Sequence, residues 1–173
     1  MSAFRLLIGL GNPGSEYAKT RHNAGFWLLD RLADQLNLEF KAESKFFGQL
    51  AKVALGVHHL FLLKPMTYMN RSGQSALALA QFYKVDVEQI LIVHDELDIE
   101  AGQIRLKRGG GHGGHNGLRD LHRVFGPDYA RIRVGIGHPG HKSQVHNYVL
   151  SKPPTDARQH IDDGIDATLS YFP

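Results

Sequence analysis

The stretch Phe4-Arg5-Leu6-Leu7-Ile8-Gly9-Leu10 decides the fold, together with the segments that follow it, Gly11-Asn12-Pro13-Gly14-Ser15-Glu16-Tyr17 and Thr20-Arg21-His22-Asn23-Ala24-Gly25. The apolar run 4–10 predicts a buried strand, and the turn-forming residues after it predict a tight loop at the rim of a sheet. That rim is where α/β proteins place their chemistry. His22 falls on it, and a histidine is suited to proton transfer near neutral pH.

Strands and helices alternate along the rest of the chain. We expect helices over 24–38, 73–83, 116–125 and 155–172, and strands over 48–55, 59–64, 90–94, 102–107 and 130–137. This alternation predicts one α/β domain over residues 1–173, with a twisted, mixed, mostly parallel β-sheet flanked by helices on both faces. In the last strand, Ile132 and Val134 are expected on the buried face and Arg131 and Arg133 on the polar face.

Composition narrows the class of protein. The 173 residues are 42% apolar and 21% charged, which is ordinary for a soluble globular protein. Cysteine is absent, which excludes disulfides, thiol catalysis and cysteine-ligated zinc. No apolar run approaches the roughly 20 residues of a membrane span, and the N-terminus lacks the pattern of a signal peptide. We therefore expect a cytoplasmic protein.

Gly9, Gly11 and Gly14 spell the dinucleotide-binding pattern G-x-G-x-x-G. In that fingerprint the third glycine opens a helix with an apolar face, and an acidic residue ends the next strand. Here residues 15–22 carry no apolar face, and Asp30 and Asp34 fall inside the predicted helix. The pattern is better interpreted as a structural turn whose glycines supply positive φ.

Charge is unevenly spread along the chain. The segment 105–142, called the basic segment below, holds eight Lys or Arg and two Asp, whereas the whole chain has a net charge of +3. Such a segment indicates contact with a polyanion such as nucleic-acid phosphates, with a solvated surface as the alternative. Lys107 and Arg133 are its candidate phosphate-binding residues.

Four polar clusters follow predicted strands, namely residues 12–23, 64–73, 94–98 and 109–117. The last one, called the glycine loop below, has six glycines among nine residues, as expected where backbone approaches another group closely or adopts positive φ. Because they lie at successive strand ends, we expect the clusters to converge on one site.

Each polar residue also has a simpler interpretation. His22 alone fits a surface histidine, Asp95 fits a turn cap, and Asn70 fits a helix cap. His112 and His115 have the spacing of metal ligands, but a glycine-rich loop without cysteine is a poor metal scaffold. We therefore expect no metal and no cofactor.

Several motifs together resemble the bacterial-type peptidyl-tRNA hydrolase family across nearly the whole chain. They are Gly11-Asn12-Pro13-Gly14 with Tyr17 and residues 20–25, Lys64-Pro65-Met66-Thr67-Tyr68-Met69-Asn70, His94-Asp95-Glu96-Leu97, the glycine loop, and residues 133–140. The resemblance implies a monomeric, metal-free cytosolic enzyme that hydrolyses the ester between a peptide and tRNA.

The resemblance also implies roles for individual residues. His22 matches the general base, Asp95 the carboxylate that holds it, and Asn12 a residue that contacts the peptide end of the substrate. The substrate-binding positions are matched by Tyr17, Tyr68, Asn70 and Asn116. We expect His115, in the glycine loop, to be a further substrate-binding or tRNA-binding residue.

Elementary chemistry agrees with these roles. A histidine supplies a base near neutral pH, and a carboxylate on its far nitrogen fixes the tautomer. Without a G-x-S-x-G elbow or a cysteine, direct attack by water is favoured over an acyl-enzyme. Two other classes remain open from the sequence: an RNA-binding module without catalysis, and a nucleotide-dependent oxidoreductase.

Overall fold

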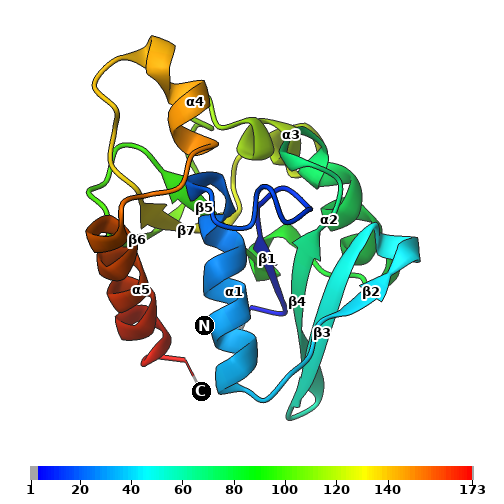
Figure 1. Cartoon of the computed structure of the whole chain (residues 1–173). Helices are drawn as coiled ribbons and strands as arrows, with labels where there is room; N and C mark the ends of the chain where they lie inside the picture. Colours follow the sequence, from blue (N-terminus) through cyan, green and yellow to red (C-terminus); the bar gives the residue numbers. More distant parts are fainter. Residues whose placement is uncertain (1–3, 173) are drawn as a thin grey trace.

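The computed structural model describes residues 4–172, which form one seven-stranded sheet (Figure 1). The strand order is β2-β3-β4-β1-β5-β7-β6. The four central strands are parallel, and β2, β3 and β6 add antiparallel edges. The predicted mixed α/β sheet is therefore confirmed, with its parallel part at the centre; residues 1–3 and 173 lie outside the description. The strands are β1 (Leu6–Gly9), β2 (Lys41–Glu43), β3 (Gly48–Leu55), β4 (His58–Pro65), β5 (Ile90–Glu96), β6 (Ile104–Arg108) and β7 (Ala130–Gly135).

Helices cover both faces of the sheet. The α-helices are α1 (Ala24–Gln35), α2 (Ser72–Phe82), α3 (Asn116–Phe125), α4 (Val145–Val149) and α5 (Thr155–Leu169). The short 3-10 helices are η1 (Arg21–Asn23), η2 (Ser44–Phe46), η3 (Met69–Arg71), η4 (Val87–Gln89) and η5 (Lys142–Gln144). Helices α1 and α5 pack on one face, and α2 and α3 pack on the other. None of these helices is both long and apolar enough to pass through a bilayer.

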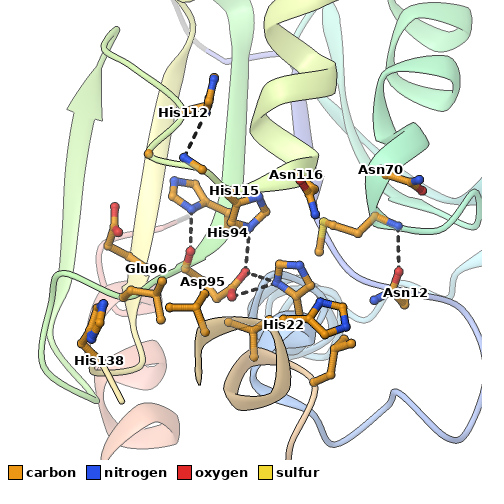
Figure 2. A pocket seen from close by; sticks show the side chains of 18 of the residues that line it. Asn12, His22, Asn70, His94, Asp95, Glu96, His112, His115, Asn116 and His138 are labelled. Atoms are coloured by element: carbon orange, nitrogen blue, oxygen red, sulfur yellow. Dashed lines mark hydrogen bonds and ion pairs between the residues drawn. The ribbon is translucent and has the colours of Figure 1, made fainter. Parts of the chain in front are cut away.

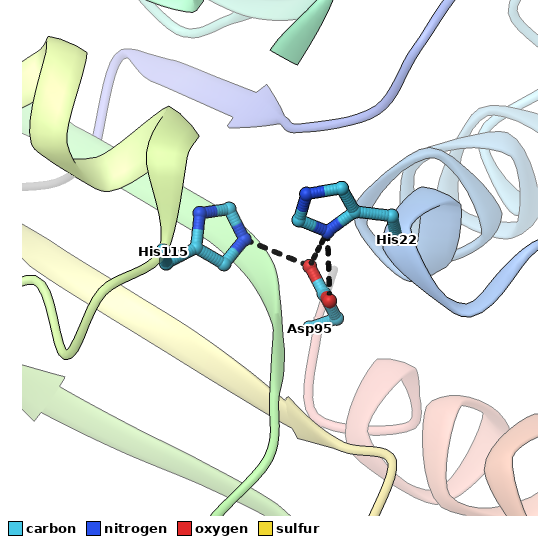
Figure 3. Close-up of side chains that lie close together, drawn as sticks. All are labelled: His22, Asp95 and His115. Atoms are coloured by element: carbon cyan, nitrogen blue, oxygen red, sulfur yellow. Dashed lines mark hydrogen bonds and ion pairs between the residues drawn. The ribbon is translucent and has the colours of Figure 1, made fainter. Parts of the chain in front are cut away.

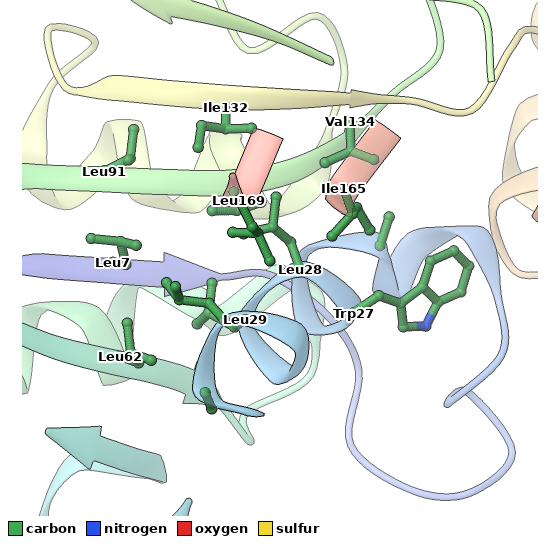
Figure 4. Close-up of a cluster of buried hydrophobic side chains, with 14 of the residues drawn as sticks. Leu7, Trp27, Leu28, Leu29, Leu62, Leu91, Ile132, Val134, Ile165 and Leu169 are labelled. Carbon is green, nitrogen blue, oxygen red and sulfur yellow. The ribbon is translucent and has the colours of Figure 1, made fainter. Parts of the chain in front are cut away.

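The sheet is buried on both sides, so its strands alternate between two cores. In β1, Leu7 points to the core under α1 and α5, whereas Leu6 and Ile8 point to the core under α2 and α3. Figure 4 shows the first core, where Leu7, Leu62, Leu91 and Ile132 from four neighbouring strands face side chains of the two helices. Each fully buried aliphatic side chain contributes about 1.5–3 kcal/mol. This packing fixes the central strands whose ends carry the site.

The first helix is shorter than its apolar spacing predicts. It ends at Gln35 because Asn37 adopts φ 56°. The amides of Asn37 and Leu38 then donate to the carbonyls of Asp34 and Ala33, at 3.2 and 2.8 Å. This double hydrogen bond is a common way to end a helix with a left-handed residue. The sequence also predicted neither β2 nor α4, which have only three and five residues.

The polar face predicted for the last strand is wrong for Arg131, which is 1% exposed. Its guanidinium donates to the carbonyls of Gly110, Gly111 and Pro127 at 3.4, 3.3 and 2.9 Å. The glycine loop therefore lies over this part of β7 and uses the arginine as an anchor. Arg131, one of the eight basic residues of the basic segment, therefore has a structural role.

Candidate active site

The parallel strands end at one edge of the sheet, where a pocket of about 760 Å³ opens (Figure 2). Loops after β1 and β4 bring Asn12 and Asn70 to it, and β5 itself brings Asp95. Eight of the ten predicted site residues line this one pocket: Asn12, Tyr17, His22, Tyr68, Asn70, Asp95, His115 and Asn116. The other two, Lys107 and Arg133, lie outside it. The expected convergence of the polar clusters is therefore present in the fold.

His22 is carried by the 3-10 turn η1 at the start of α1. Its neighbour Arg21 is buried and ties this turn to the end of α4, donating to the carbonyl of Tyr148 at 3.0 Å and to Oγ of Ser151 at 2.6 Å. The guanidinium of Arg21 also lies 3.8 Å above the Tyr148 ring. The turn that carries His22 is therefore anchored to α4 and Ser151 through Arg21 rather than being a free loop.

His22 and Asp95 form a buried ion pair in the pocket. Nδ1 of His22 lies 3.0 and 2.9 Å from the two carboxylate oxygens of Asp95. Burial alone lowers the pKa of His22, but the attraction of the Asp95 carboxylate and its hydrogen bond outweigh burial and raise that pKa above 6.5. Because Nδ1 donates to Asp95, Nε2 is the nitrogen left to accept a proton, and no described residue bonds to it.

His115 approaches the same carboxylate from another element (Figure 3). Its Nε2 lies 2.8 Å from Oδ1 of Asp95. Its Nδ1 accepts from the amides of Gly117 and Leu118 at 3.1 and 3.2 Å and so caps α3. Since amides can only donate, Nδ1 carries no hydrogen and Nε2 donates to Asp95. Burial alone raises the pKa of Asp95, but the facing His22 and His115 hold it well below its usual range.

The potential ligand atoms of His22, Asp95 and His115 lie within 4.8 Å of one another, a spacing compatible with a shared metal ion. A metal on Nε2 of His115 requires the ring hydrogen to move to Nδ1. That nitrogen faces two amide hydrogens of α3, which leave no room for a third hydrogen. The capping role of His115 therefore opposes metal binding here.

His94 is a pocket residue to which the sequence assigned no role. It is 1% exposed, and its Nδ1 lies 2.8 Å from the carbonyl of Asp95. Burial, with a smaller effect from His115, lowers the pKa of His94 to about 3. Its Nε2 has no hydrogen-bond partner within residues 4–172. A histidine at the end of an apolar strand gives no sequence signal that separates a core residue from a site residue.

Asn12 is fixed by three hydrogen bonds. Its backbone amide donates to Oδ1 of Asn23 at 2.9 Å, and its carbonyl accepts from Nδ2 of Asn23 at 3.0 Å. Its own Oδ1 accepts from the amide of Met69 at 2.7 Å. The Nδ2 group of Asn12 is therefore the end of the carboxamide left for a ligand, and Figure 2 shows it turned to the side on which His22 lies.

Glycines bring the site's backbones together. A Cβ on Gly25 would lie 2.3 Å from the Val93 carbonyl, and a Cβ on Gly9 would lie 2.5 Å from the Gly25 carbonyl. Positive φ is confirmed for Gly14 but is wrong for Gly9 and Gly11, which are glycines because α1 packs directly on them. A turn rather than a helix follows Gly14, so a helix N-terminus does not face the pocket here.

The glycine loop shows both features expected of its glycines, which are positive φ and close approach of the backbone to another group. Positive φ occurs at Gly109, Gly110, Gly113 and Gly114. A Cβ on Gly117 would lie 2.5 Å from Sδ of Met69, so this position needs a glycine for close approach. The loop can therefore bring His115 to Asp95 while α3 packs against η3.

Lys107 and Arg133 belong to a basic surface on the β6–β7 edge. Arg105 pairs with Arg133 and Lys107 with Arg131 across the two strands. Arg133 lies 3.7 Å from Glu96, whereas Arg105 and Lys107 form no ion pair with any described residue. Three of these four side chains are at least partly exposed, so this face carries uncompensated positive charge next to the pocket wall at Glu96.

A wall of the pocket comes from α4 and its flanks, which the sequence did not predict. Val145, Val149 and Leu150 give it an apolar side, and His138, Lys142 and His146 complete it. With only five residues in α4, no helical spacing was available to find it.

Comparison with known proteins adds to this geometry. A profile of the family described as peptidyl-tRNA hydrolase matches residues 6–172. The chain is 55% identical to a peptidyl-tRNA hydrolase of Neisseria meningitidis over 99% of this chain and 90% of the relative. It is 54% identical to the peptidyl-tRNA hydrolase of Delftia acidovorans over 98% of this chain and 82% of the relative. A crystal structure of the Acinetobacter baumannii peptidyl-tRNA hydrolase superposes with a TM-score of 0.94 at 54% identity, covering 98% of this chain and 87% of that one.

Proposed function

The chain belongs to the peptidyl-tRNA hydrolase family, and we propose that its pocket hydrolyses the ester of peptidyl-tRNA with His22 as the general base. The observation that best supports this proposal is the His22–Asp95 pair. Because Nδ1 of His22 bonds to Asp95, Nε2 stays free to accept a proton in the pocket. The whole chain acts as one catalytic domain. Asp95 holds the ring and stabilises the imidazolium that forms during the reaction.

Water is the nucleophile in this proposal. No serine, threonine or cysteine lines the pocket among the described residues, which favours direct attack over an acyl-enzyme. Nε2 of His22 takes a proton from the water as its oxygen bonds to the ester carbonyl carbon. The bond from that carbon to the ribose oxygen then breaks, and the proton returns to the ribose oxygen. The products are a peptide carboxylate and tRNA with a free terminal hydroxyl.

Neutral amides are suited to stabilise the charge that develops on the carbonyl oxygen. Nδ2 of Asn12 is the best candidate donor because its Oδ1 is already occupied by Met69. Asn70 and Asn116 line the same pocket and can hold the peptide backbone without side-chain preference. The rings of Tyr17 and Tyr68 meet edge to face at 6.2 Å and offer a surface for substrate.

The tRNA lies on the basic β6–β7 face in this proposal. Lys107 and Arg133 contact phosphates, giving affinity that depends on salt but not on base sequence. Glu96 lines the pocket and touches Arg133, so the phosphate-binding face leads directly into the site. Since the substrate arises in translation, the proposed location is the cytoplasm, and the chain acts as a monomer without a cofactor.

The test is release of N-acetyl-amino acid from N-acetyl-aminoacyl-tRNA, run in H₂¹⁸O, with free aminoacyl-tRNA as a matched substrate. We expect rapid release from the blocked substrate, slower release from the free one, and ¹⁸O in the released carboxylate. Label in the tRNA hydroxyl instead would contradict attack at the carbonyl carbon. A parallel reaction with chelator tests the absence of a metal requirement.

Two outcomes favour the other classes. Tight tRNA binding without any release identifies an RNA-binding module. A thermal shift on adding NAD(P) identifies a nucleotide-dependent enzyme, although the turn after Gly14 lacks the helix that such a site needs.

A further inference from the structure

Tyr68 has the most unusual backbone conformation in the pocket. Its φ and ψ are 62° and 155°. This region is open to glycine, whereas an L side chain at such angles is strained. The Tyr68 ring is 53% exposed, so packing of the side chain does not hold the backbone in this conformation.

Hydrogen bonds of the Tyr68 carbonyl and of Met69, the next residue, hold the strained conformation. The Tyr68 carbonyl accepts from the amide of Arg71 at 3.1 Å. The next amide, that of Met69, donates to Oδ1 of Asn12 at 2.7 Å in a buried environment. Met69 itself is anchored through its carbonyl, which accepts from Oγ of Ser72 at 2.7 Å.

The Met69 amide determines which way the Asn12 carboxamide faces. Only the oxygen of that group can accept from an N–H, so Oδ1 points at Met69 and Nδ2 at the pocket. Relaxing φ and ψ at Tyr68 rotates the peptide group between residues 68 and 69 and withdraws the N–H. The carboxamide is then free to turn its oxygen toward the substrate, where an oxygen repels a developing oxyanion.

We propose that Tyr68 is a positioning residue through its backbone: its positive-φ conformation places the Met69 amide that holds Asn12 with the amide nitrogen facing the ester. This inference rests on the proposed function, since it assigns Asn12 a donor role in peptidyl-tRNA hydrolysis. It is separate from any contact of the Tyr68 ring with substrate.

The experiment compares Tyr68→Ala with Tyr68→Gly in the full chain. Both variants lack the ring, but only glycine adopts φ 62° and ψ 155° without strain. Glycine normally destabilises relative to alanine. Here we expect the Tm of the glycine variant to exceed that of the alanine variant by about 2–8 °C. We expect the kcat of the alanine variant to be about tenfold lower than that of the glycine variant, with similar KM, because strain at alanine favours rotation of the peptide group and Asn12 is then held less firmly.

Lys84 provides the matched control. It is exposed, has φ 54°, and follows α2 far along the chain from any pocket residue. Lys84→Gly relative to Lys84→Ala should raise Tm in the same way with no change in kcat. A difference in kcat within this pair as well would overturn the proposal, since strain anywhere in the chain would then change the rate.

A double-mutant cycle tests the route through Asn12. In an Asn12→Ala background, the Ala and Gly variants of Tyr68 should have equal kcat. A tenfold difference that persists without the Asn12 amide overturns the proposal, as do equal kcat values in the native background. If the native chain releases no peptide from N-acetyl-aminoacyl-tRNA, the proposed function fails instead, and the two failures are thereby distinguished.

Discussion

Nε2 of His115 donates to Oδ1 of Asp95 at 2.8 Å, across 20 residues of chain, while the other nitrogen of the same ring caps α3. One side chain therefore links the start of a helix to the carboxylate of the site. The substrate-binding or tRNA-binding role expected for His115 stays a prediction. The geometry adds a second role in orienting Asp95.

Two substitutions of His115 should separate these contacts. Asparagine is a good N-cap but is too short to reach Asp95, so His115→Asn should keep most of the stability that His115→Ala loses, about 1 kcal/mol. Both should reduce hydrolysis by roughly 10- to 100-fold, the worth of a hydrogen bond to a charged group. Denaturant unfolding and peptide release measure the two effects. Native activity in His115→Asn would show that the contact with Asp95 is dispensable.

Replacing His22 with alanine should remove most hydrolysis and leave the fold intact. Loss of a general base lowers the rate by about 10²–10⁴-fold. Peptide release and a melting curve are the measurements. His160→Ala, an exposed histidine on α5, is the matched control and should keep full activity. A His22 variant within a few-fold of the native rate contradicts the assignment.

Asp95→Asn should shift the pH dependence. His22 acts as a base only when unprotonated, so native kcat/KM should rise with pH through a pKa above 6.5. Removing the carboxylate charge lowers the pKa of His22. The rise of kcat/KM with pH should therefore move to lower pH, and the maximal kcat/KM at high pH should fall. Titration of the histidine by NMR checks the shift. An unchanged titration would show that Asp95 does not control His22.

The same pair affects stability with a defined sign. A raised pKa in the folded state means that the contact stabilises protonated His22. That contribution is fully present below the unfolded-state pKa and is lost as pH rises through the folded-state pKa. The stability difference between the native chain and Asp95→Asn should therefore shrink as pH rises from the unfolded-state pKa of histidine through the raised folded-state pKa of His22.

Lys107→Ala and Arg133→Ala should weaken binding about equally for all tRNA species, since phosphates carry no sequence information. Each lost phosphate contact lowers the slope of log affinity against log salt by up to about one unit. Lys52→Ala, an exposed lysine on β3 near the other edge of the sheet, is the control. If the slopes of all three variants match the native slope, the tRNA surface lies elsewhere.

Arg131→Met should lower the free energy of unfolding much more than Arg133→Met does. It removes three hydrogen bonds that tie Gly110, Gly111 and Pro127 to β7, and a hydrogen bond to a charged group contributes about 1.5–3 kcal/mol. The free energy of unfolding should fall by at least about 2 kcal/mol. Arg133→Met, whose side chain is partly exposed, should change it by less than about 1 kcal/mol. Equal losses would refute the anchoring role.

The sequence predicted much of the architecture because periodicity and turn chemistry are local. The expected helix 116–125 and strand 48–55 match the structure at both ends. Convergence of polar clusters followed from parallel strands ending at one edge, and this brought His22 next to Asp95 across 73 residues. These inferences needed only the alternation of elements.

Three features could not be predicted because they depend on distant contacts. Alternation placed Arg131 on the polar face but did not show that a loop covers that face. The hydrogen on Nε2 of His115 depends on how α3 begins. The positive φ at Tyr68 has no signature, since turn rules expect glycine there. Each is decided by tertiary packing rather than by neighbours in the chain.

The contact between Gly9 and Gly25 links the position of His22 to the packing of α1 on the central strands. The turn bearing His22 rests backbone against backbone on β1 and β5, with no side chain between them to absorb a shift. A larger residue at either position would displace His22, the proposed base, and open the core in the same step. The position of the proposed base is therefore set by the same backbone contact that seats α1 on the sheet.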